Sequence, residues 1–406
     1  MSDEREDSVK KALGKEAAYG PSIDIDNFDE GESEPEQIEK LADAPEDLKK
    51  KMENVGVTVD ESHREGTILF IDNGMSHCSS TRAQEGLFIM NTKTALEKYD
   101  WARRLNWNLM DPTKDKYTAK TFLENSDGYF IYVKPGVHLK FPVQTCMMLS
   151  KHKGIQNLHN IIFVDHDASM DIITGCTTVH GANDALHVGV SEIYIADNAS
   201  LSFSMIHSWN DNTAVRPRTN ARLGKNARYV NNYVVLDPVG TVQSYPTAFL
   251  EGEGASCSFN TMCIAHENSN IDTGGCAFLN APRSGAEILS RNITYGGSMV
   301  ARGRLVGNAP GIKAHLECRS IVQKDGGVTE AIPELEAHLA DVEMTHEAAV
   351  GKIAQDQIEY LMSRGLSEDD AVSMIIRGFL VGGIKGLPDS LRDEINRAID
   401  KANAGN

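Results

Sequence analysis

The feature that most constrains the fold of this chain is a strand–turn–strand repeat in its middle. The segment IFVDHDASMDI, residues 162–172, aligns with IYIADNASLSF, residues 193–203. Similar turns place a small residue at nearly regular intervals, at Ala168, Ala199, Ala227, Ala255 and Ala286. One strand–turn–strand unit cannot bury its apolar side chains alone, so successive copies stack on one another. The repeat predicts a β-solenoid, although evenly spaced strands also suit a β-sandwich.

The regions around this core have a different composition. Residues 1–40 are polar and acidic, with the run DIDNFDEGESEPEQ, which predicts a disordered or loosely docked arm. Residues 41–127 read as a helical or mixed region, with a helical pattern over 92–108. Strand-like runs dominate residues 128–344, and residues 345–406 read as a C-terminal helical domain. We therefore expect a mainly β protein, with a parallel β-helix core between an N-terminal helical or disordered region and C-terminal helices.

The C-terminal helices have recognisable ends. Thr345 is a predicted N-cap for a helix that begins at His346. Gly365 is a predicted stop, and Ser367 with Asp370 predicts the cap of the next helix. A last helix is expected over residues 390–402.

Composition excludes several function classes. The 406 residues are 41% hydrophobic, enough for a large core, and the net charge of −18 argues against a nucleic-acid partner. No stretch approaches the ~20 apolar residues of a membrane span. The N-terminal MSDEREDSVKK lacks the apolar segment of a signal peptide, and no P-loop pattern is present. We expect a cytoplasmic protein without a membrane or nucleic-acid partner.

Seven cysteines are scattered through the chain without a Cys-x-x-Cys pair, which favours neither a disulfide framework nor structural zinc. Cys318 follows Ala314 and Leu316 in an alternating, strand-like run. A thiol, an imidazole and a carboxylate, from Cys318, His346 and Glu347, are therefore expected near a strand-to-helix junction. Such groups bind soft or borderline metals. A buried, inert Cys318 in a purely structural adaptor is the plainer alternative.

Several segments resemble, in the same order, the SUF-type iron–sulfur cluster scaffold family (SufB/SufD). They are IDTGGCAF, HLECRSIV, EAIPELEA and THEAAVGKIAQDQIEYLMSRGLSEDDA, and the resemblance covers roughly the last two-thirds of the chain. It implies an archaeal-type, SufB-like member with a β-helix core. It also implies a scaffold, not an enzyme, that holds a transient iron–sulfur cluster of the 4Fe–4S type.

The resemblance also implies roles for individual residues. Cys318, Glu347 and His346 match positions that ligate the nascent cluster. Cys176 matches a cysteine that receives sulfur, and a structural cysteine in the core of the solenoid is the equal alternative. Cys276 is a secondary ligand candidate. Thr345 departs from the pattern, because many bacterial SufB chains carry an acid there.

The family's partners are carried over in the same way. The resemblance implies a SufC-type ABC ATPase on the C-terminal helices, together with a sulfur donor and cluster acceptor proteins. A four-iron cluster usually takes four ligands, and one chain offers three groups here. We therefore expect a homodimer whose two-fold axis doubles the ligand set.

The main alternative is a β-helix lyase or hydrolase that acts on carbohydrate. It would need paired carboxylates roughly 5–10 Å apart. Asp165, Asp167 and Asp171 could supply them, but Asp165 and Asp167 flank a turn and no basic partner is evident.

Overall fold

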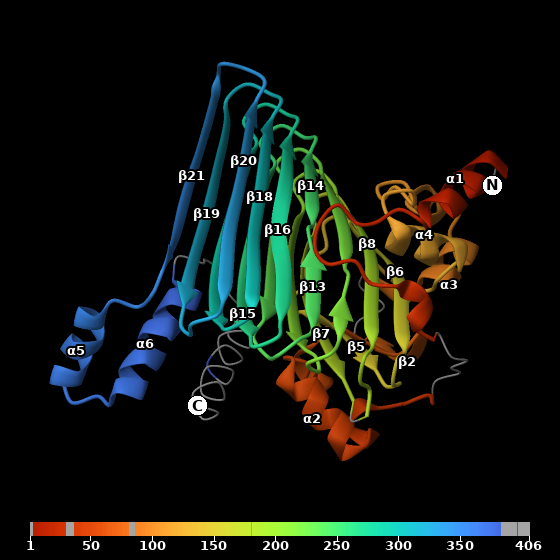
Figure 1. The fold of residues 1–406 in the computed structure, drawn as a ribbon. Coiled ribbons are helices and arrows are strands. Elements are labelled where there is room, and N and C mark those ends of the chain that lie inside the picture. Colours follow the sequence, from red (N-terminus) through yellow and green to blue (C-terminus); the bar gives the residue numbers. More distant parts are fainter. Residues whose placement is uncertain (1–2, 30–35, 81–85, 180, 383–395, 397–406) are drawn as a thin grey trace.

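The computed structural model describes residues 3–29, 36–80, 86–179, 181–382 and 396 (Figure 1). Strands make up 46% of the chain and helices 19%, and the strands coil into a β-solenoid of about eight turns. Helices α1, α3 and α4 lie at one end of the solenoid, and α5 and α6 lie at the other (Figure 1). The predicted fold class, a mainly β chain with a parallel β-helix core, is confirmed.

Two sheets form the walls of the solenoid, and we call them sheet 1 and sheet 2. Sheet 1 has ten strands: β2 (Gly74–Ser80), β1 (Gly66–Ile71), β5 (Val143–Leu149), β7 (Ser169–Thr178), β9 (Ser200–Ser208), β12 (Arg228–Val235), β15 (Ser256–His266), β17 (Gly285–Tyr295), β19 (Ile312–Val322) and β21 (Val342–Gly351). Sheet 2 has eleven: β3 (Leu87–Asn91), β4 (Tyr129–Val133), β6 (Ile155–Val164), β8 (Leu186–Ile195), β10 (Ala214–Val215), β11 (Arg218–Leu223), β13 (Thr241–Ser244), β14 (Thr247–Leu250), β16 (Asn270–Leu279), β18 (Ser298–Gly307) and β20 (Val328–Ala337).

The described α-helices are short and lie outside the two sheets. They are α1 (Asp3–Ala12), α2 (Glu46–Asn54), α3 (Thr92–Lys98), α4 (Lys116–Leu123), α5 (Gln355–Ser363) and α6 (Glu368–Val381). In the described part of the chain, no helix combines the length and apolarity that crossing a membrane requires.

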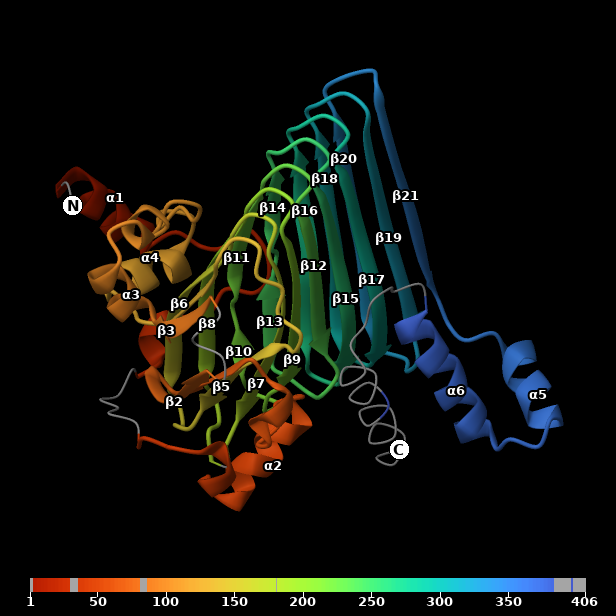
Figure 2. The same ribbon diagram turned by 180° about the vertical axis from the view of Figure 1, so that it is seen from behind.

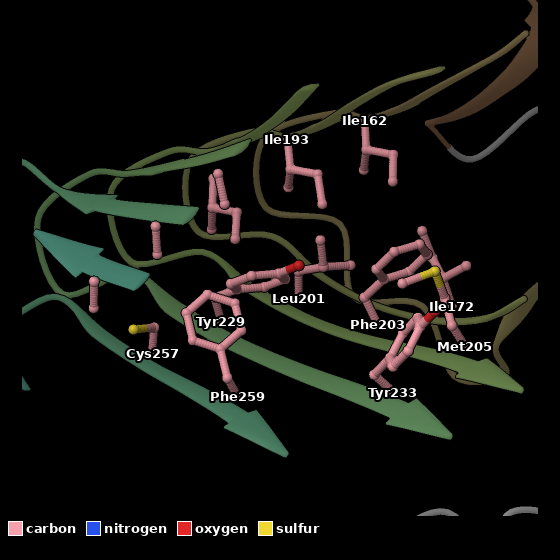
Figure 3. Close-up of a cluster of buried hydrophobic side chains, with 14 of the residues drawn as sticks. Ile162, Ile172, Ile193, Leu201, Phe203, Met205, Tyr229, Tyr233, Cys257 and Phe259 are labelled. Atoms are coloured by element: carbon pink, nitrogen blue, oxygen red, sulfur yellow. The ribbon is translucent and has the colours of Figure 1, made fainter. Parts of the chain in front are cut away.

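Side chains that alternate along each strand fill the space between the sheets. Ile162 pairs with Ile193, and Ile172 with Phe203, so the two aligned sequence segments stack in register as the repeat predicted. These four residues are buried in one continuous apolar cluster (Figure 3). Because side chains alternate between faces, every second residue of a strand points into the lumen.

The corners of the solenoid repeat a left-handed backbone residue. Positive φ angles occur at equivalent positions of six coils, at Asp167, Asn198, Asn226, Gly254, Arg283 and Gly311. Asn226 Nδ2 donates a hydrogen bond to Asn198 Oδ1, and Asn198 Nδ2 donates to Asp167 Oδ1, each at 3.0 Å. Asn and Asp tolerate this conformation better than other side chains do.

The predicted alanine series is wrong at Ala286, which does not occupy the corner position of its coil. Ser256 pairs with Gly285, so the residue that corresponds to Ala255 is Ser284, and Ala286 corresponds to Cys257. The coil that follows Ala255 is therefore shorter than the spacing to Ala286 implies. Because Ser284 and Ala286 are both small, the sequence conceals which of them occupies the corner.

The expectation of a helix from Thr345 is also wrong. Residues Val342–Gly351 form β21, which pairs in parallel with β19 from Ile312 to Ile321. The next helix, α5, begins at Gln355. Without β21, the backbone N–H and C=O groups on one edge of β19 would be unpaired. The free energy gained by pairing them exceeds what a helix capped by Thr345 would gain.

Two other C-terminal predictions are confirmed. Gly365 follows α5 with φ +97°, and the Ser367 hydroxyl caps α6 by accepting from the Asp370 backbone N–H. The helix expected over 390–402 lies outside the described residues. The division of the chain into domains at residues 40, 127 and 344 stays a prediction.

The N-terminal region is more ordered and contains more strand than its composition predicts. Residues 3–29 are docked, with Val9 of α1 buried against Ala119 of α4. Lys116 Nζ donates to Glu16 at 3.0 Å, and the Gly20 backbone N–H donates to Asp272 at 3.1 Å. Strands β1–β3 lie in the region expected to be helical or mixed, and α3 is shorter than the helical pattern over 92–108.

The two ends of the solenoid differ. At the N-terminal end, β2 and β3 pair antiparallel with β1 and β4, and they are the only antiparallel strand pairs in the described chain. At the C-terminal end, β20 and β21 pair on one side only among the residues that the structure describes. Figure 2 shows α2 and α6 against the lower part of sheet 1. Residues Ile376 and Leu380 of α6 share a buried cluster with Ile293 and Ile321.

We predict that the corner conformation limits substitution at Asn226. Asn226→Val should lower the free energy of unfolding by about 1–2 kcal/mol more than Asn226→Gly, because a side chain branched at Cβ is strained at positive φ. Both variants lose the same hydrogen bond to Asn198, so glycine is a matched control. Urea unfolding followed by circular dichroism measures the difference, and equal midpoints would contradict the prediction.

Candidate functional site

Cys318 lies inside the solenoid, next to its open end. It belongs to β19, pairs with Ser290 on one side and Ala348 on the other, and is 0% exposed. Its side chain is part of the central apolar cluster. Burial raises the pKa of the thiol to about 11, against smaller lowering effects of Ser290 and Arg291. The thiol is therefore protonated at neutral pH in this conformation.

His346 and Glu347 lie on β21, one strand further out than Cys318. His346 pairs with Leu316, so it shares the lumen side of the sheet with Cys318. Glu347 pairs with Glu317 and therefore lies on the outer side. Both residues are exposed, because no further coil covers β21 in the described chain. Strand alternation thus separates the three residues that the sequence groups together.

The carboxylate of Glu347 belongs to a charged network on the outer face of sheet 1. Arg319 Nη2 donates to Glu347 Oε2 at 3.3 Å, and Arg319 Nε contacts Glu317 Oε1. Arg291 Nη2 donates to the other Glu317 oxygen at 3.0 Å. Within the described ranges, no three His, Cys, Asp or Glu side chains are placed to hold one metal ion. A single chain in this conformation therefore offers separate ligands and, among these residues, no complete set.

Cys176 lies inside the same lumen, several coils away. It belongs to β7 and is 2% exposed, and burial raises the pKa of its thiol well above the usual value. On the next strand its register partner is His207 of β9. Cys176 and Cys318 therefore face one interior space from the same sheet.

His207 is a feature that sequence reasoning missed. Trp209 Nε1 donates to His207 Nδ1 at 2.9 Å, and because an indole N–H only donates, Nδ1 is the acceptor. Burial lowers the pKa of His207 well below its usual value, so the ring is neutral and its hydrogen is on Nε2. This Nε2–H is buried, and no acceptor lies within reach in the described part of the chain. Beside Cys176 the lumen therefore carries an unused hydrogen-bond donor.

The column of inward side chains that contains Cys176 and His207 includes further polar residues nearer to the C-terminal end. Successive register partners on sheet 1 are Cys176, His207, Val235, Cys263, Asn292 and Ser320. Both amide atoms of Asn292 and the hydroxyl of Ser320 are buried without a partner among the residues described. Buried polar groups are normally hydrogen-bonded, so these residues are unusual polar positions in an apolar core. The only signal in the sequence is a polar residue at inward positions of otherwise apolar strands.

Cys276 does not share this lumen. It lies on β16 of sheet 2, where Ile271 and Ala277 point inward, so its side chain points outward. Burial raises the pKa of the thiol to about 12, and the nearby charges of Arg304 and Lys114 oppose that shift. The structure therefore does not bring Cys276 together with Cys318.

Two of the three carboxylates considered for a carbohydrate-active site, Asp165 and Asp167, have structural partners. Asp165 accepts from the Tyr132 hydroxyl at 2.9 Å, and Asp167 is a corner residue that accepts from Asn198. Both carboxylates therefore have roles at the corners and edges of the coils. The carbohydrate alternative gains no support from this arrangement.

Comparison with known proteins identifies the family of this chain. The family described as "SUF system FeS cluster assembly, SufBD core domain" matches residues 147–379. This match covers more than half of the chain, including β7, β19 and β21. The chain belongs to the SufBD family. Its predicted resemblance is confirmed.

Relatives from several organisms match almost the whole SufBD-family chain. An "Iron-sulfur cluster assembly SufBD family protein" of Methanothermobacter thermautotrophicus is 40% identical over 403 residues, 98% of each chain. One of Archaeoglobus fulgidus with the same description is 43% identical over 354 residues, 87% of this chain and 95% of the relative. The "Iron-sulfur cluster assembly protein SufB" of Bacillus subtilis is 27% identical over 394 residues, 94% of this chain and 84% of the relative.

We predict that Arg291 and Arg319 contribute very differently to stability, although both contact Glu317. Arg291→Met should lower the free energy of unfolding by about 3 kcal/mol, because it removes one partner of a buried ion pair. The side chain of Arg319 is 49% exposed, so Arg319→Gln should cost about 1 kcal/mol or less. Urea unfolding of the two variants measures the difference. Similar losses of unfolding free energy in the two variants would show that the buried ion pair of Glu317 with Arg291 adds no more stability than the exposed contact with Arg319.

Proposed function

We propose that this SufBD-family chain is a scaffold on which an iron–sulfur cluster is assembled as cargo near Cys318 and Glu347. The observation that carries the proposal is the position of Cys318, a lumen thiol one strand below the open edge of the solenoid. Thiolate is the preferred protein ligand of iron in clusters. His346 lies on the same lumen side, one strand further out, and supplies an imidazole.

The ligand set is completed by a second copy of the chain. One chain offers Cys318 and His346 on the lumen side and Glu347 on the outer side, so two copies related by a two-fold axis double each group. The cluster is of the 4Fe–4S type, which usually takes four ligands. Weaker nitrogen and oxygen ligands suit a scaffold that must release its cargo.

The open edge supports the homodimer and favours β21 as the strand that pairs. Unpaired strand edges invite pairing with another chain. The N–H of Val328, at the start of β20, bonds to Gly297 just before β18, and the N–H of His338, just after β20, bonds to Gly307 of β18. The odd-numbered positions between Val328 and His338 therefore face the open edge. Pro333 is one of these positions and has no N–H to donate. The edge of β20 is therefore interrupted at its centre, whereas β21 contains no proline.

Cys176 has the role of receiving sulfur for the cluster. It shares the lumen with Cys318, and its column of register partners includes the polar residues His207, Asn292 and Ser320, the last of which is the next inward residue after Cys318 on β19. The unused Nε2–H of His207 is a donor for a sulfur atom carried on Cys176. Cys276, which faces outward from the other sheet, stays a secondary ligand candidate that a mutation can test.

The ATPase partner, of the SufC type, docks on the C-terminal helices. Large apolar side chains on α5 and α6 are unusually exposed: Tyr360 is 58%, Met362 41% and Met374 51% exposed. Aromatic residues and methionine are enriched in protein interfaces. The chain itself performs no turnover, and ATP hydrolysis belongs to the partner. A sulfur donor and cluster acceptor proteins complete the set of partners.

The decisive experiment compares two lumen cysteines. Anaerobic reconstitution of the full chain with iron and sulfide should give a brown protein with about two irons per chain, if two chains share four irons. Cys318→Ser should lose most of this iron, because a hydroxyl is a poorer iron ligand than a thiolate. Cys263→Ser is the matched control, since Cys263 is also buried in the lumen but lies away from the edge. Iron and sulfide assays with sedimentation give the stoichiometry, and equal cluster content in both variants would remove Cys318 from the site.

A second prediction concerns the helices. Tyr360→Glu together with Met374→Glu should reduce binding of the ATPase by at least about tenfold, because each places a charge in an apolar interface. Leu13→Glu is the control, since Leu13 is 39% exposed on the N-terminal arm. Pull-down with the ATPase measures the effect, and circular dichroism should show unchanged strand content. Full binding by the double variant would place the partner elsewhere.

A further inference from the structure

One row of side chains on the outer face of sheet 2 is almost entirely aromatic. The row crosses seven successive strands of the sheet, from β3 to β16. Its members are register partners of one another: Phe88, Tyr132, Phe163, Tyr194, Arg222, Phe249 and Phe278. The residues next to them along the strands, such as Ile131, Ile162 and Ala248, belong to the central apolar cluster. Because side chains alternate between faces, the aromatic row points away from the lumen.

Five rings at the N-terminal end of the solenoid form one patch, which we call the aromatic platform: Phe88, Tyr99, Trp101, Tyr132 and Phe163. The ring centroids of Tyr132 and Phe163 are 5.3 Å apart, and those of Phe88 and Tyr132 are 5.7 Å apart. Trp101 and Tyr99 follow α3 in the chain. The Trp101 ring lies 4.7 Å from that of Tyr132 and 5.8 Å from that of Tyr99. The platform is therefore built from two strands of one row, one antiparallel end strand and the segment after α3.

The chain covers the middle of the aromatic row more completely than the platform. Tyr194 is 6% exposed, and its hydroxyl donates to the carbonyl of Leu105 at 2.8 Å. In the platform, by contrast, Trp101 is 36% exposed and the other four rings are half-buried. A contiguous apolar patch that stays partly exposed is typical of an interaction site.

Two lysines border the platform and lack a carboxylate partner. Lys134 Nζ lies 5.1 Å from the ring centroid of Phe88, and Lys98 Nζ lies 5.4 Å from that of Tyr99. Within the described ranges, neither ammonium group contacts an acidic side chain. The platform therefore combines aromatic surface with two positive charges that are not neutralised.

The cations further along the same row are neutralised. Arg222 Nε lies 3.2 Å from Glu251 Oε2. Arg304 lies over the Phe278 ring, 5.9 Å from its centroid, and donates to Glu336 at 2.9 Å. Aromatic rings and cations thus recur along the row, but free positive charge lies at the platform, in a chain whose net charge is −18. Complementary charge selects the partner of such a surface, so the partner should carry carboxylates.

We propose that the aromatic platform docks an acidic segment of another protein, in which carboxylates flank an aromatic or aliphatic side chain. The apolar side chain of this segment packs on Trp101 and Phe163, and its carboxylates pair with Lys98 and Lys134. Single-stranded nucleic acid also stacks on aromatic rings, but it requires a positively charged groove along its backbone. Two free lysines on a strongly acidic chain favour the protein segment.

The position of the platform separates this partner from the other proposed ones. It lies at the end of the solenoid that carries α3, whereas α5 and α6 lie at the opposite end with Cys318 (Figure 1). A partner docked on the platform therefore leaves the candidate cluster site and the C-terminal helices accessible. The inference does not depend on the proposed function.

The first test selects random peptides displayed on phage. Peptides are selected on the full chain and then depleted on the Trp101→Ala/Phe163→Ala variant, which lacks two rings of the platform. The peptides that remain should be enriched in aspartate and glutamate next to an aromatic or aliphatic residue. Enrichment of basic peptides, or complete depletion by the variant, would overturn the proposal.

The second test measures the affinity of the most enriched peptide by fluorescence anisotropy. Lys98→Glu/Lys134→Glu should weaken binding at least about tenfold, because both free charges are reversed while all five rings remain. Raising the salt to about 0.5 M should weaken binding to the unmodified chain as well. Lys352→Glu is the matched charge control, since this exposed lysine follows β21 at the other end.

A matched control for the rings comes from the same row. Phe249→Ala/Phe278→Ala removes two rings that stack with centroids 5.3 Å apart but lie outside the platform, so the peptide should bind this variant with unchanged affinity. Iron content after reconstitution should be normal in the Lys98→Glu/Lys134→Glu variant, which separates the platform from the cluster site. Unchanged peptide affinity in that variant would overturn the proposal. Displacement of the peptide by an equal concentration of a thymidine oligonucleotide would also overturn it and assign the platform to nucleic acid.

Discussion

The structure depends on one constraint: each coil must pair the backbone groups that the coil before it leaves open. Parallel strands do this over about eight turns, and the side chains between the two sheets are then aligned in columns. At the N-terminal end, β2 and β3 reverse direction and finish each sheet with an antiparallel strand. At the C-terminal end no such strand follows β20 and β21 within the described residues, so the constraint remains unmet there. The residues matched to cluster chemistry, Cys318, His346 and Glu347, lie on the last two strands of sheet 1 at this end.

The same constraint explains which sequence predictions succeeded. The repeat predicted the solenoid because its apolar and small residues recur at the period of one coil, which physical stacking requires. The helix expected from Thr345 failed because THEAAV has good helical propensity and a capping residue, while the strand that overrides both, β19, belongs to the preceding coil. Propensity is local, and pairing is not. The equivalence of Ala255 with Ser284 was hidden for a related reason, since only the pairing of β15 with β17 distinguishes Ser284 from the equally small Ala286.

The site was predictable as a set of residues but not as an arrangement. Family motifs identify Cys318, His346 and Glu347, yet only the register shows that Glu347 lies on the opposite side of the sheet from the other two. His207 carries no motif, and its unused donor follows from its burial and from Trp209, which lies just past the end of the same strand. The side of Glu347 and the unused donor of His207 can be predicted from the sequence only if it is known which face of each strand points into the lumen. The outer network of Arg291, Glu317 and Arg319 was likewise invisible, because its members come together only across strands.

The stacking of the coils has a consequence for the spacing of the two thiols. Five strand-to-strand steps separate β7, which carries Cys176, from β19, which carries Cys318, and each step is about 4.8 Å. The separation across the strands is therefore fixed at about 24 Å and can change only in whole steps. Loss or duplication of one coil would shorten or lengthen the interior route while every side chain kept its face. A single residue inserted within a strand would instead move the side chains beyond it to the opposite face of the sheet. In this architecture, the separation of Cys176 and Cys318 along the solenoid can change during evolution only by the gain or loss of whole coils.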